Sequence, residues 1–492
     1  MHTTSINRTL KLTGFAPAGK PRNSMRRACA VVVLCAATAI ALRAQTLTTL
    51  ASFGGRDGGA PDAVLVQATN GQFYGATFNN TIFTITPTGT LTLLFTFDGT
   101  DGDFPDAGLV QAANGYLYGT TYTGGANNDC QIGGCGTIFK ITPRGTLTTV
   151  YNFCSQNGCT DGANPTAGLI QANNGDLYGT TQGDGANGTG GTVFKITPGG
   201  TLTTLYSFCA LPYPCADGAN PSGLVQAIDG NFYGTTGNGG ANNAGTIFKI
   251  TPGGTLTTLY SFCAQSGCPD GENPQAALIQ ANNGNFYGTT GNGGTNGSYG
   301  TVFEITPSGA LTTIYSFCAQ SGCTDGTDPL AALVQGTDGR LYGTTAKGGA
   351  NGDGTVFKIT PSGALTTLHS FGGADGFDPM AGLMQATNGE FYGTTADGGA
   401  NGFGTVFSLS VGLGPFVETQ TTVGKVGAAV KILGTDLTGA TSVTFNGTAA
   451  VFNVVAPSLI TATVPAGATT GTVEVVTPGG TLSSNVPYRV KP

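Results

Sequence analysis

Ten of the twelve cysteines form five closely spaced pairs along the chain. The pairs are Cys130/Cys135, Cys154/Cys159, Cys209/Cys215, Cys263/Cys268 and Cys318/Cys323. An even number of cysteines in close pairs, in a chain with an export signal, predicts local disulfides that stiffen long loops. The alternative chemistry is metal binding by thiolates, but zinc sites need four convergent ligands and often include histidine. We therefore expect disulfides and no metal centre at these cysteines.

Carboxylates recur in a second pattern, the motif Asp-Gly-x-x-Pro. It begins at Asp57, Asp101, Asp161, Asp217, Asp270, Asp325 and Asp375. A ring of carboxylates could hold Ca²⁺ or contact a cationic partner, and Asp161, Asp217, Asp270 and Asp325 are the calcium candidates. Asp before Gly is also a common turn former, because its side chain accepts backbone hydrogen bonds. Recurrence in every unit favours the turn role.

Other chemistry has little material to work with. The chain has two histidines, no tryptophan and 83 glycines, so isolated Gly-x-Gly strings carry no weight as nucleotide motifs. No Ser/His/Asp set or phosphate-binding loop stands out. We expect no catalytic residue, and no cofactor apart from the calcium alternative. His369 replaces a recurrent tyrosine, and we expect it to be a tolerated surface substitution.

These residues sit on a tandem repeat. Its Phe/Leu-Tyr-Gly string places tyrosine at Tyr74, Tyr118, Tyr178, Tyr233, Tyr287, Tyr342 and Tyr392. The step of 44 to 60 residues fits one four-stranded propeller blade. Within a unit we expect strands such as 108–112, 231–236, 246–251 and 255–262, because β-branched and aromatic residues alternate between Gly, Pro and Asn clusters. The prediction is an all-β fold with a seven-bladed β-propeller at 45–411.

The ends of the array are complementary. The repeat region begins with a fourth-type strand at Thr46 to Phe53, and its last unit stops after a third-type strand at Thr405 to Ser410. The N-terminal strand can therefore complete the last blade and close the ring, which removes a free sheet edge. The two long loops of each unit share one face, where ligand sites are expected.

A glutamine recurs in each first strand. The positions are Gln67, Gln111, Gln171, Gln226, Gln280, Gln335 and Gln385. If this strand is the innermost one, the glutamines line the centre. We expect a hydrogen-bonded ring that ties neighbouring blades together, in preference to a binding pore.

Residues 1–44 have the features of a secretion signal. They hold seven of the 19 basic residues and no acidic one, with an apolar run from Ala28 to Leu42. Met25 is a possible true start. The apolar run is shorter than the roughly 20 residues of a spanning helix, so we expect no transmembrane span in the mature chain. That chain carries 12 basic against 26 acidic residues, which argues against nucleic acid as a partner.

Four short strings recur in the repeat units: Gly-Thr-Val-Phe-Lys-Ile-Thr-Pro at 354–361, Leu-Thr-Thr-Leu-Tyr-Ser-Phe at 202–208, Asp-Gly-Ala-Asn-Pro at 161–165 and Tyr-Gly-Thr-Thr at 342–345. They resemble the GloVer-type (choice-of-anchor) tandem repeats of exported bacterial proteins. That family supplies no catalytic residue to transfer. The Ile-Thr-Pro and Asp-Gly-Asn-Phe-Tyr rhythm looks more distantly like the streptogramin lyase propellers, which use a histidine. Residues 412–492 include Val443-Thr-Phe-Asn446-Gly447 and Ile460-Thr-Ala-Thr-Val-Pro465, and resemble an IPT/TIG immunoglobulin-like domain.

These features predict an exported, non-catalytic binding or structural protein. It would be secreted, periplasmic or held at the cell surface, with the long-loop face contacting a glycan, an extracellular protein or a surface. The alternatives are a carboxylate-dependent lyase or hydrolase of the propeller class, and a purely structural envelope protein. The sequence leaves the ligand, the mode of cell attachment and the oligomeric state open.

Overall fold

The computed structural model describes residues 45–491 apart from 131–132 and 212–213, and the expected export signal at 1–44 lies outside this range. The described part of the chain consists of strands and turns with two short 3-10 helices, η1 (Asn157–Cys159) and η2 (Ser321–Cys323). No helix in it is long and apolar enough to cross a membrane.

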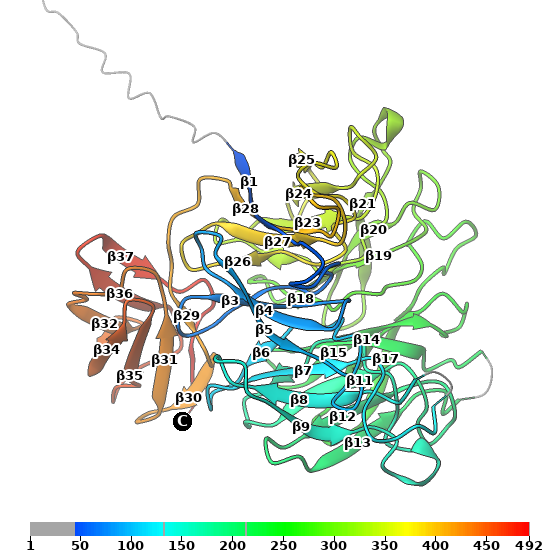
Figure 1. Cartoon of the computed structure of the whole chain (residues 1–492), viewed down its shortest axis with the longest axis horizontal. Coiled ribbons are helices and arrows are strands. Elements are labelled where there is room, and N and C mark those ends of the chain that lie inside the picture. The colour runs from blue at the N-terminus through cyan, green and yellow to red at the C-terminus, as the bar shows by residue number, and fades with distance from the viewer. Residues whose placement is uncertain (1–44, 131–132, 212–213, 492) are drawn as a thin grey trace, which may run out of the picture. The chain divides into compact units, whose positions relative to one another are not determined.

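Seven four-stranded antiparallel sheets follow one another along the described repeat region (Figure 1). We call them blades 1 to 7, in chain order of their first strands. Blade 1 holds β2 (Val66–Gln67), β3 (Phe73–Thr77), β4 (Thr81–Ile85) and β5 (Leu91–Thr96). Blade 2 holds β6 (Val110–Gln111), β7 (Leu117–Thr121), β8 (Thr137–Ile141) and β9 (Leu147–Asn152). Blade 3 holds β10 (Ile170–Gln171), β11 (Leu177–Thr181), β12 (Thr192–Ile196) and β13 (Leu202–Ser207).

The remaining blades follow the same order. Blade 4 holds β14 (Ala219–Gln226), β15 (Phe232–Asn238), β16 (Thr246–Ile250) and β17 (Leu256–Ser261). Blade 5 holds β18 (Ile279–Gln280), β19 (Phe286–Thr290), β20 (Thr301–Ile305) and β21 (Leu311–Ser316). Blade 6 holds β22 (Val334–Gln335), β23 (Leu341–Thr345), β24 (Thr355–Ile359) and β25 (Leu365–Ser370). Blade 7 holds β26 (Met384–Gln385), β27 (Phe391–Thr395) and β28 (Thr405–Ser410) together with β1 (Thr46–Ser52).

Blade 7 combines strands from both ends of the repeat region. β1 pairs antiparallel with β28, so that Thr46 lies opposite Ser410 and Ser52 lies opposite Thr405. Phe53 follows β1 directly and is fully buried, with its ring 5.1 Å from that of Phe83 in blade 1. The N-terminal strand therefore supplies the outer strand of the last blade, in the place that the other blades fill with their own fourth strand.

The repeated Tyr-Gly string has a packing reason. In blade 2, Tyr118 of β7 is fully buried, and a Cβ atom on Gly119 would lie 2.5 Å from Cζ of Phe139 on β8. Glycine therefore leaves the space that this phenylalanine ring fills. In each of the remaining six blades, the glycine of this string lies against the equivalent phenylalanine of the third strand. This packing explains why the string recurs with so little change.

The glutamines of the first strands join neighbouring blades. Each Oε1 accepts a hydrogen bond of 2.8–3.0 Å from a backbone N–H of the preceding blade. The donor and acceptor pairs are Thr69/Gln111, Ala113/Gln171, Asn173/Gln226, Ile228/Gln280, Asn282/Gln335, Thr337/Gln385 and Thr387/Gln67. The last pair joins blade 7 to blade 1. The glutamines therefore serve as inter-blade ties, as the sequence predicts.

The first strands are shorter than the sequence predicts. Six of the seven contain two residues, as in β6, where Val110 and Gln111 pair with Tyr118 and Leu117. Only β14 of blade 4 extends over eight residues. The innermost strand has a neighbour on one side only, so its pairing ends where it leaves the second strand.

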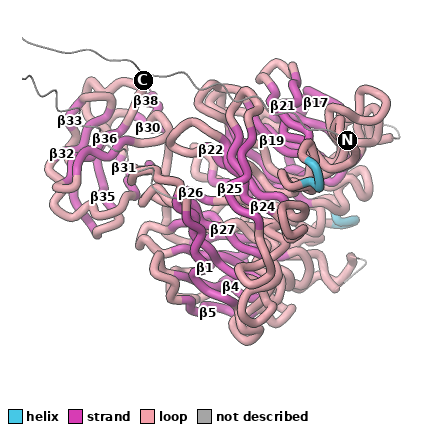
Figure 2. The backbone as a smooth tube through the Cα atoms, turned by 90° about the horizontal axis from the view of Figure 1, so that it is seen from above, coloured by secondary structure: helices cyan, strands magenta, loops and turns pink. Residues whose placement is uncertain are grey.

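Residues after the propeller form a separate β-sandwich, whose strands are drawn in magenta in Figure 2. One sheet contains β29 (Glu418–Thr419), β31 (Ala429–Leu433), β35 (Leu459–Thr463) and β34 (Phe452–Ala456). The other contains β33 (Thr448–Ala449), β32 (Ser442–Phe445), β36 (Val473–Thr477) and β37 (Gly480–Ser483). β30 (Val423–Lys425) and β38 (Arg489–Lys491) form a parallel pair. The buried core of the sandwich includes Val430, Ile432, Phe445 and Ile460. The predicted combination of propeller-like blades and an immunoglobulin-like domain is confirmed.

Candidate functional site

The long loops hold the five cysteine pairs, and all five are disulfides. They are Cys130–Cys135, Cys154–Cys159, Cys209–Cys215, Cys263–Cys268 and Cys318–Cys323. The last four lie in successive loops from a fourth strand to the next blade, after β9, β13, β17 and β21. The pair Cys130–Cys135 differs, because it lies in the loop between β7 and β8 of blade 2. The predicted local staples are therefore present.

The Cys209–Cys215 pair shows that these cysteines do more than the sequence predicts. Cys215 adopts the left-handed backbone conformation, with a φ angle of 59°, which is uncommon for a residue other than glycine. Its carbonyl oxygen accepts backbone N–H bonds from Gly218 at 2.7 Å and from Gly240 at 2.9 Å. The second cysteines of the other three loops accept corresponding pairs of bonds, at Cys159, Cys268 and Cys323. The expectation of a simple staple at Cys215 was therefore incomplete, because this residue also closes a turn and joins its loop to the one between β15 and β16.

The aspartates of the Asp-Gly-x-x-Pro motif are engaged within their own loops. Oδ2 of Asp161 accepts hydrogen bonds from the Tyr151 hydroxyl at 2.8 Å and from the Ser155 backbone N–H at 2.9 Å. Asp325 accepts the corresponding bonds from Tyr315 and Ala319, and both carboxylates are fully buried. Asp217 and Asp270 are held in the same way.

This arrangement gives the turn role a physical basis. Burial, followed by the hydrogen bond to Asp161, raises the pKa of Tyr151 to about 12. The tyrosine therefore stays protonated and donates to the carboxylate. A cation at Asp161, Asp217, Asp270 or Asp325 would have to compete with these donors, and calcium binding there stays a prediction.

His369 lies in β25 and contacts the loop that follows this strand, which the sequence does not predict. Its Nε2 lies 2.6 Å from Oδ2 of Asp375, and its side chain is 25% exposed. The histidine takes the place that tyrosine holds in blades 2 to 5, opposite the same motif aspartate. The substitution therefore preserves a structural contact.

A position that the sequence analysis did not single out is the residue after the motif proline. The seven blades carry different side chains there: Asp62, Asp106, Thr166, Ser222, Gln275, Leu330 and Met380. We call these residues the post-proline ring. The Asp, Gly and Pro of the motif are invariant, whereas this position and the two x positions vary in chemical type. Blades 1 and 2 supply carboxyl groups, blades 3 to 5 supply neutral polar groups, and blades 6 and 7 supply apolar side chains.

A hollow of about 310 Å³ lies against part of this ring. Thr166, Ser222 and Gln275 line it together with small residues that include Gly108 and Gly168. Residues from five blades contribute, which places the hollow at the centre of the propeller, on the side of the long loops. The small residues leave space at the centre, and Thr166, Ser222 and Gln275 supply polar side chains to it.

The two carboxyl groups of the ring are electrostatically unusual. The Oδ1 atoms of Asp62 and Asp106 are buried and have no hydrogen-bond partner among the described residues. Burial raises the pKa of Asp62 to about 6. Burial, followed by the charges of Asp62 and Asp103, raises the pKa of Asp106 to about 8. Val64 and Gly108, each two residues after one of these aspartates, line the hollow, but the two carboxyl groups themselves are not among its lining residues. Buried carboxyl groups with strongly raised pKa values are candidates for functional sites.

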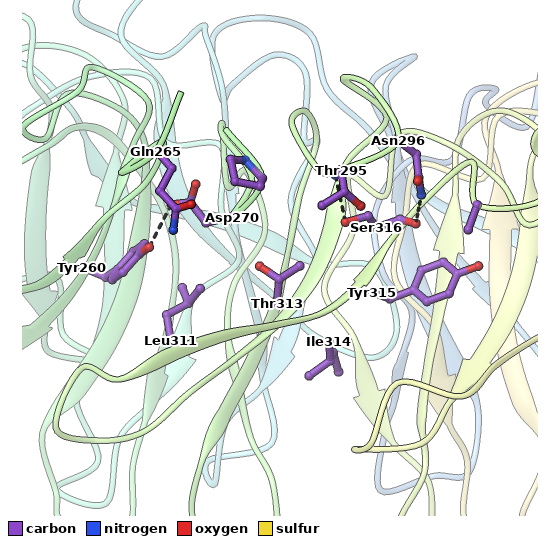
Figure 3. A pocket seen from close by; sticks show the side chains of 12 residues that line it. Tyr260, Gln265, Asp270, Thr295, Asn296, Leu311, Thr313, Ile314, Tyr315 and Ser316 are labelled. Atoms are coloured by element: carbon purple, nitrogen blue, oxygen red, sulfur yellow. Dashed lines mark hydrogen bonds between the residues drawn. The ribbon is translucent and has the colours of Figure 1, made fainter. Parts of the chain in front are cut away.

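A larger groove of about 670 Å³ lies between blades 4 and 5, at their outer strands (Figure 3). Several of its polar groups are paired within the protein. The Tyr260 hydroxyl donates to Asp270 at 2.9 Å, and Nδ2 of Asn296 donates to the Ser316 carbonyl at 2.9 Å. Equivalent tyrosine and aspartate residues recur in other blades, so this groove follows from the repeat. The central hollow is the better candidate because its lining differs from blade to blade.

Charge is also distributed unevenly between the two kinds of loop. The long loops carry most of the aspartates of the propeller, whereas Arg56 and Lys347 are the basic residues that they contain. Lysines instead recur on third strands, as at Lys140, Lys195 and Lys249. The long-loop side of the propeller is therefore predominantly acidic.

The model of the Gloeobacter/Verrucomicrobia repeat matches the chain at residues 37–215, 78–280, 210–407 and 265–450. The IPT/TIG domain model matches residues 415–490. None of the curated proteins matches the chain.

Several solved structures are similar in backbone arrangement. The extracellular domain of a putative hybrid two-component system from B. thetaiotaomicron has a TM-score of 0.49 and 11% identity, over 89% of this chain and 54% of that one. This chain thus spans about half the length of that domain. The WD40 β-propeller domain of Doa1 has a TM-score of 0.48 and 11% identity, over 74% of this chain and 97% of that domain. PorZ of Porphyromonas gingivalis, a surface component of the type-IX secretion system, has a TM-score of 0.45 and 12% identity, over 86% of this chain and 58% of PorZ. Likenesses at these scores do not bear on activity.

Proposed function

We propose, from the premise that this chain belongs to the Gloeobacter/Verrucomicrobia repeat family and carries an IPT/TIG domain, that it is an exported binding protein that recognises a glycan at the centre of its long-loop face. The observation that carries this proposal is the post-proline ring. Among seven equivalent positions, only Asp62 and Asp106 bear carboxyl groups, and neither Oδ1 has a protein partner among the described residues.

The chemistry of the ring suits a neutral, hydroxyl-rich ligand. With its pKa raised to about 8, the Asp106 carboxyl is mostly protonated at neutral pH, so it can both donate and accept hydrogen bonds. Thr166, Ser222 and Gln275 add hydroxyl and amide groups at the hollow. Leu330 and Met380 follow in blades 6 and 7, and Met380 is 44% exposed. Ligand sites typically combine an apolar wall with a few polar groups that fix orientation, and a sugar ring offers both kinds of surface.

The disulfides support a role outside the cytoplasm. Disulfides persist in oxidising compartments, and five of them stiffen loops on the proposed binding side. A rigid loop loses less conformational entropy when it binds, so stapled loops favour affinity.

A glycan array with the mature protein, residues 45–492, tests the proposal. We expect a defined group of glycans to bind, and binding to be lost in the double variant Asp62→Asn/Asp106→Asn. The matched control is Asp129→Asn, which removes an exposed carboxylate that does not belong to the post-proline ring. Equal binding by the double variant would place the ligand elsewhere, and an array without any bound glycan would reject the glycan proposal.

A second candidate is a carboxylate-dependent lyase or hydrolase. The observation that favours it is the neighbouring pair Asp62 and Asp106, whose pKa values are raised to different levels, about 6 and about 8. Two carboxyl groups held at different pKa values can divide the roles of base and acid. Incubating each bound glycan with the protein and measuring its mass separates the two candidates. An unchanged mass supports binding alone, and a smaller product that requires both aspartates supports catalysis.

A further inference from the structure

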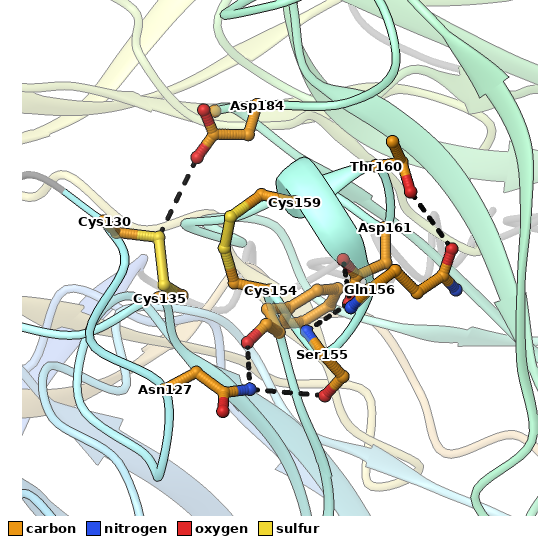
Figure 4. The surroundings of a disulfide bond; sticks show 12 residues. Asn127, Cys130, Cys135, Cys154, Ser155, Gln156, Cys159, Thr160, Asp161 and Asp184 are labelled. Carbon is orange, nitrogen blue, oxygen red and sulfur yellow. Dashed lines mark hydrogen bonds between the residues drawn. A yellow bond between two sulfur atoms is a disulfide. The ribbon is translucent and has the colours of Figure 1, made fainter.

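The loops of blade 2 bring two disulfides together (Figure 4). Cys130–Cys135 lies in the loop between β7 and β8, and Cys154–Cys159 lies in the loop that follows β9. The Sγ atoms of Cys130, Cys135 and Cys154 lie within 4.8 Å of one another. The Sγ atoms of Cys130 and Cys159 are within the same distance of each other.

Packing and hydrogen bonds hold the two loops in register. Cys135 and Cys154 are buried in one hydrophobic cluster, with Cys130 and Cys159 packed against it. Nδ2 of Asn127 in the first loop donates to the Phe153 carbonyl at 2.7 Å, directly before the second disulfide. The four sulfur atoms therefore lie close together and are held in place by the surrounding packing.

Within the described residues, none of the other disulfides has a second disulfide close by. Cys263–Cys268 has a carboxylate close by, since Sγ of Cys268 lies 3.6 Å from Oε2 of Glu272, but no second pair adjoins it among the described residues. Cys130 has a corresponding carboxylate, with its Sγ 3.8 Å from Oδ2 of Asp184. The pair at Cys263 thus has a nearby carboxylate but no second disulfide, and both of its cysteines are partly exposed.

We propose that Cys130, Cys135, Cys154 and Cys159 form a thiol–disulfide exchange centre, which takes electrons from a dithiol at Cys130–Cys135 and passes them to Cys154–Cys159. The argument for this centre does not rest on the proposed glycan binding. Access favours Cys130 as the point of entry, because Cys130 is partly exposed whereas Cys135 is fully buried.

The electrons and protons balance over four steps. One thiolate of the dithiol attacks Sγ of Cys130, and Cys135 leaves as a thiolate that takes a proton. The second thiol of the reagent displaces Cys130, so the reagent ends as its disulfide. The Cys130 thiolate attacks Sγ of Cys159, which forms a Cys130–Cys159 bond and releases Cys154. Attack by Cys135 on Cys130 then restores Cys130–Cys135 and leaves Cys154 and Cys159 as thiols.

Asp184 controls the rate of this exchange in the proposal. A disulfide sulfur has no hydrogen, so the contact between Cys130 and Asp184 becomes a hydrogen bond only after reduction. The carboxylate then disfavours the thiolate form of Cys130, and the thiolate is the attacking species. Asp184→Asn should therefore lower the pKa of that thiol and speed the exchange. Each unit of lower pKa gives about tenfold more thiolate at a pH below the pKa.

The experiment treats the mature protein with one equivalent of dithiothreitol, quenches it with acid, alkylates the free thiols and maps all linkages by mass spectrometry. We expect free Cys154 and Cys159, a trapped Cys130–Cys159 linkage, and slower reduction of Cys263–Cys268. In Cys130→Ser/Cys135→Ser we expect Cys154–Cys159 to be reduced as slowly as Cys263–Cys268. In Asp184→Asn the pH profile of the exchange should move to lower pH.

Two results would overturn the proposal. One is the recovery of native linkages only, with all pairs of the unaltered protein reduced at equal rates. The other is a Cys154–Cys159 reduction rate that does not change when Cys130 and Cys135 are replaced. The comparison of pairs within the unaltered protein needs no variant, so it decides the matter even if the double serine variant fails to fold.

Discussion

The substitution Phe53→Ala tests whether the N-terminal strand completes blade 7. Phe53 is fully buried, and its ring packs edge-on against Phe83 at 5.1 Å in a cluster with Tyr392 and Val406. Truncating a buried phenylalanine to alanine costs about 3–5 kcal/mol. That is a large part of the roughly 5–15 kcal/mol by which a typical protein is stable. We therefore expect a clear fall in the unfolding midpoint.

The matched control is Phe262→Ala. Phe262 occupies the equivalent position after β17, is fully buried, and meets Phe303 at 5.3 Å, far in sequence from either end of the repeat region. Urea unfolding of both variants, followed by far-UV circular dichroism, should give similar losses. A Phe53→Ala variant within about 0.5 kcal/mol of the unaltered protein, the usual range of a surface change, would refute the pairing of β1 with β28 if Phe262→Ala were strongly destabilised.

Three further outcomes are expected. Gln385→Ala removes the acceptor of the Thr337 N–H at 3.0 Å and should lower the unfolding free energy by about 1–3 kcal/mol in urea titrations; an unchanged value would contradict its role as a tie. The folded-state pKa of Asp106 is raised to about 8, so the folded protein holds this proton more tightly than the unfolded chain. Stability should therefore fall as pH rises from about 4 to about 8, and the fall should be smaller in Asp106→Asn; equal slopes would contradict the raised pKa. His369→Tyr should restore the tyrosine contact to Asp375 and keep the thermal midpoint, whereas His369→Ala should lose about 1 kcal/mol; equal midpoints would show that the contact is not stabilising.

The sequence predicts much of the fold because the relevant patterns are local. Alternation, turn residues and the Tyr-Gly string identify the strands, and the fourth-type strand at Thr46 indicates the partner of β28. The short first strands, such as β6, are not predicted, since the pairing of Val110 depends on how far β7 accompanies it. The glutamine ties are predicted because a polar residue that recurs on an innermost strand must find partners in its neighbours.

The candidate site was predicted less well. The motif aspartates attract attention because they recur, yet the structure engages carboxylates such as Asp161 in their own turns. The cysteines are predicted as staples, but their spacing does not show that the carbonyl of Cys215 also joins two loops. Asp62 and Asp106 escape notice because they appear in two units only. Their raised pKa values come from burial and, for Asp106, from charges that include one on another blade, and neither cause can be read from a single repeat.

By itself, the sequence determined the repeat, the strand types, the cysteine pairs and the two domain families, because each of these is written in short stretches of adjacent residues. The tertiary structure alone decided that Thr166, Ser222 and Gln275, which follow prolines of three different blades, line one hollow, and that Cys130–Cys135 lies beside Cys154–Cys159. Both juxtapositions result from strand pairing and from the packing of one loop against another. Contacts of this kind depend on which distant segments of the chain come to lie side by side. The order of residues within one blade does not specify which segments these are.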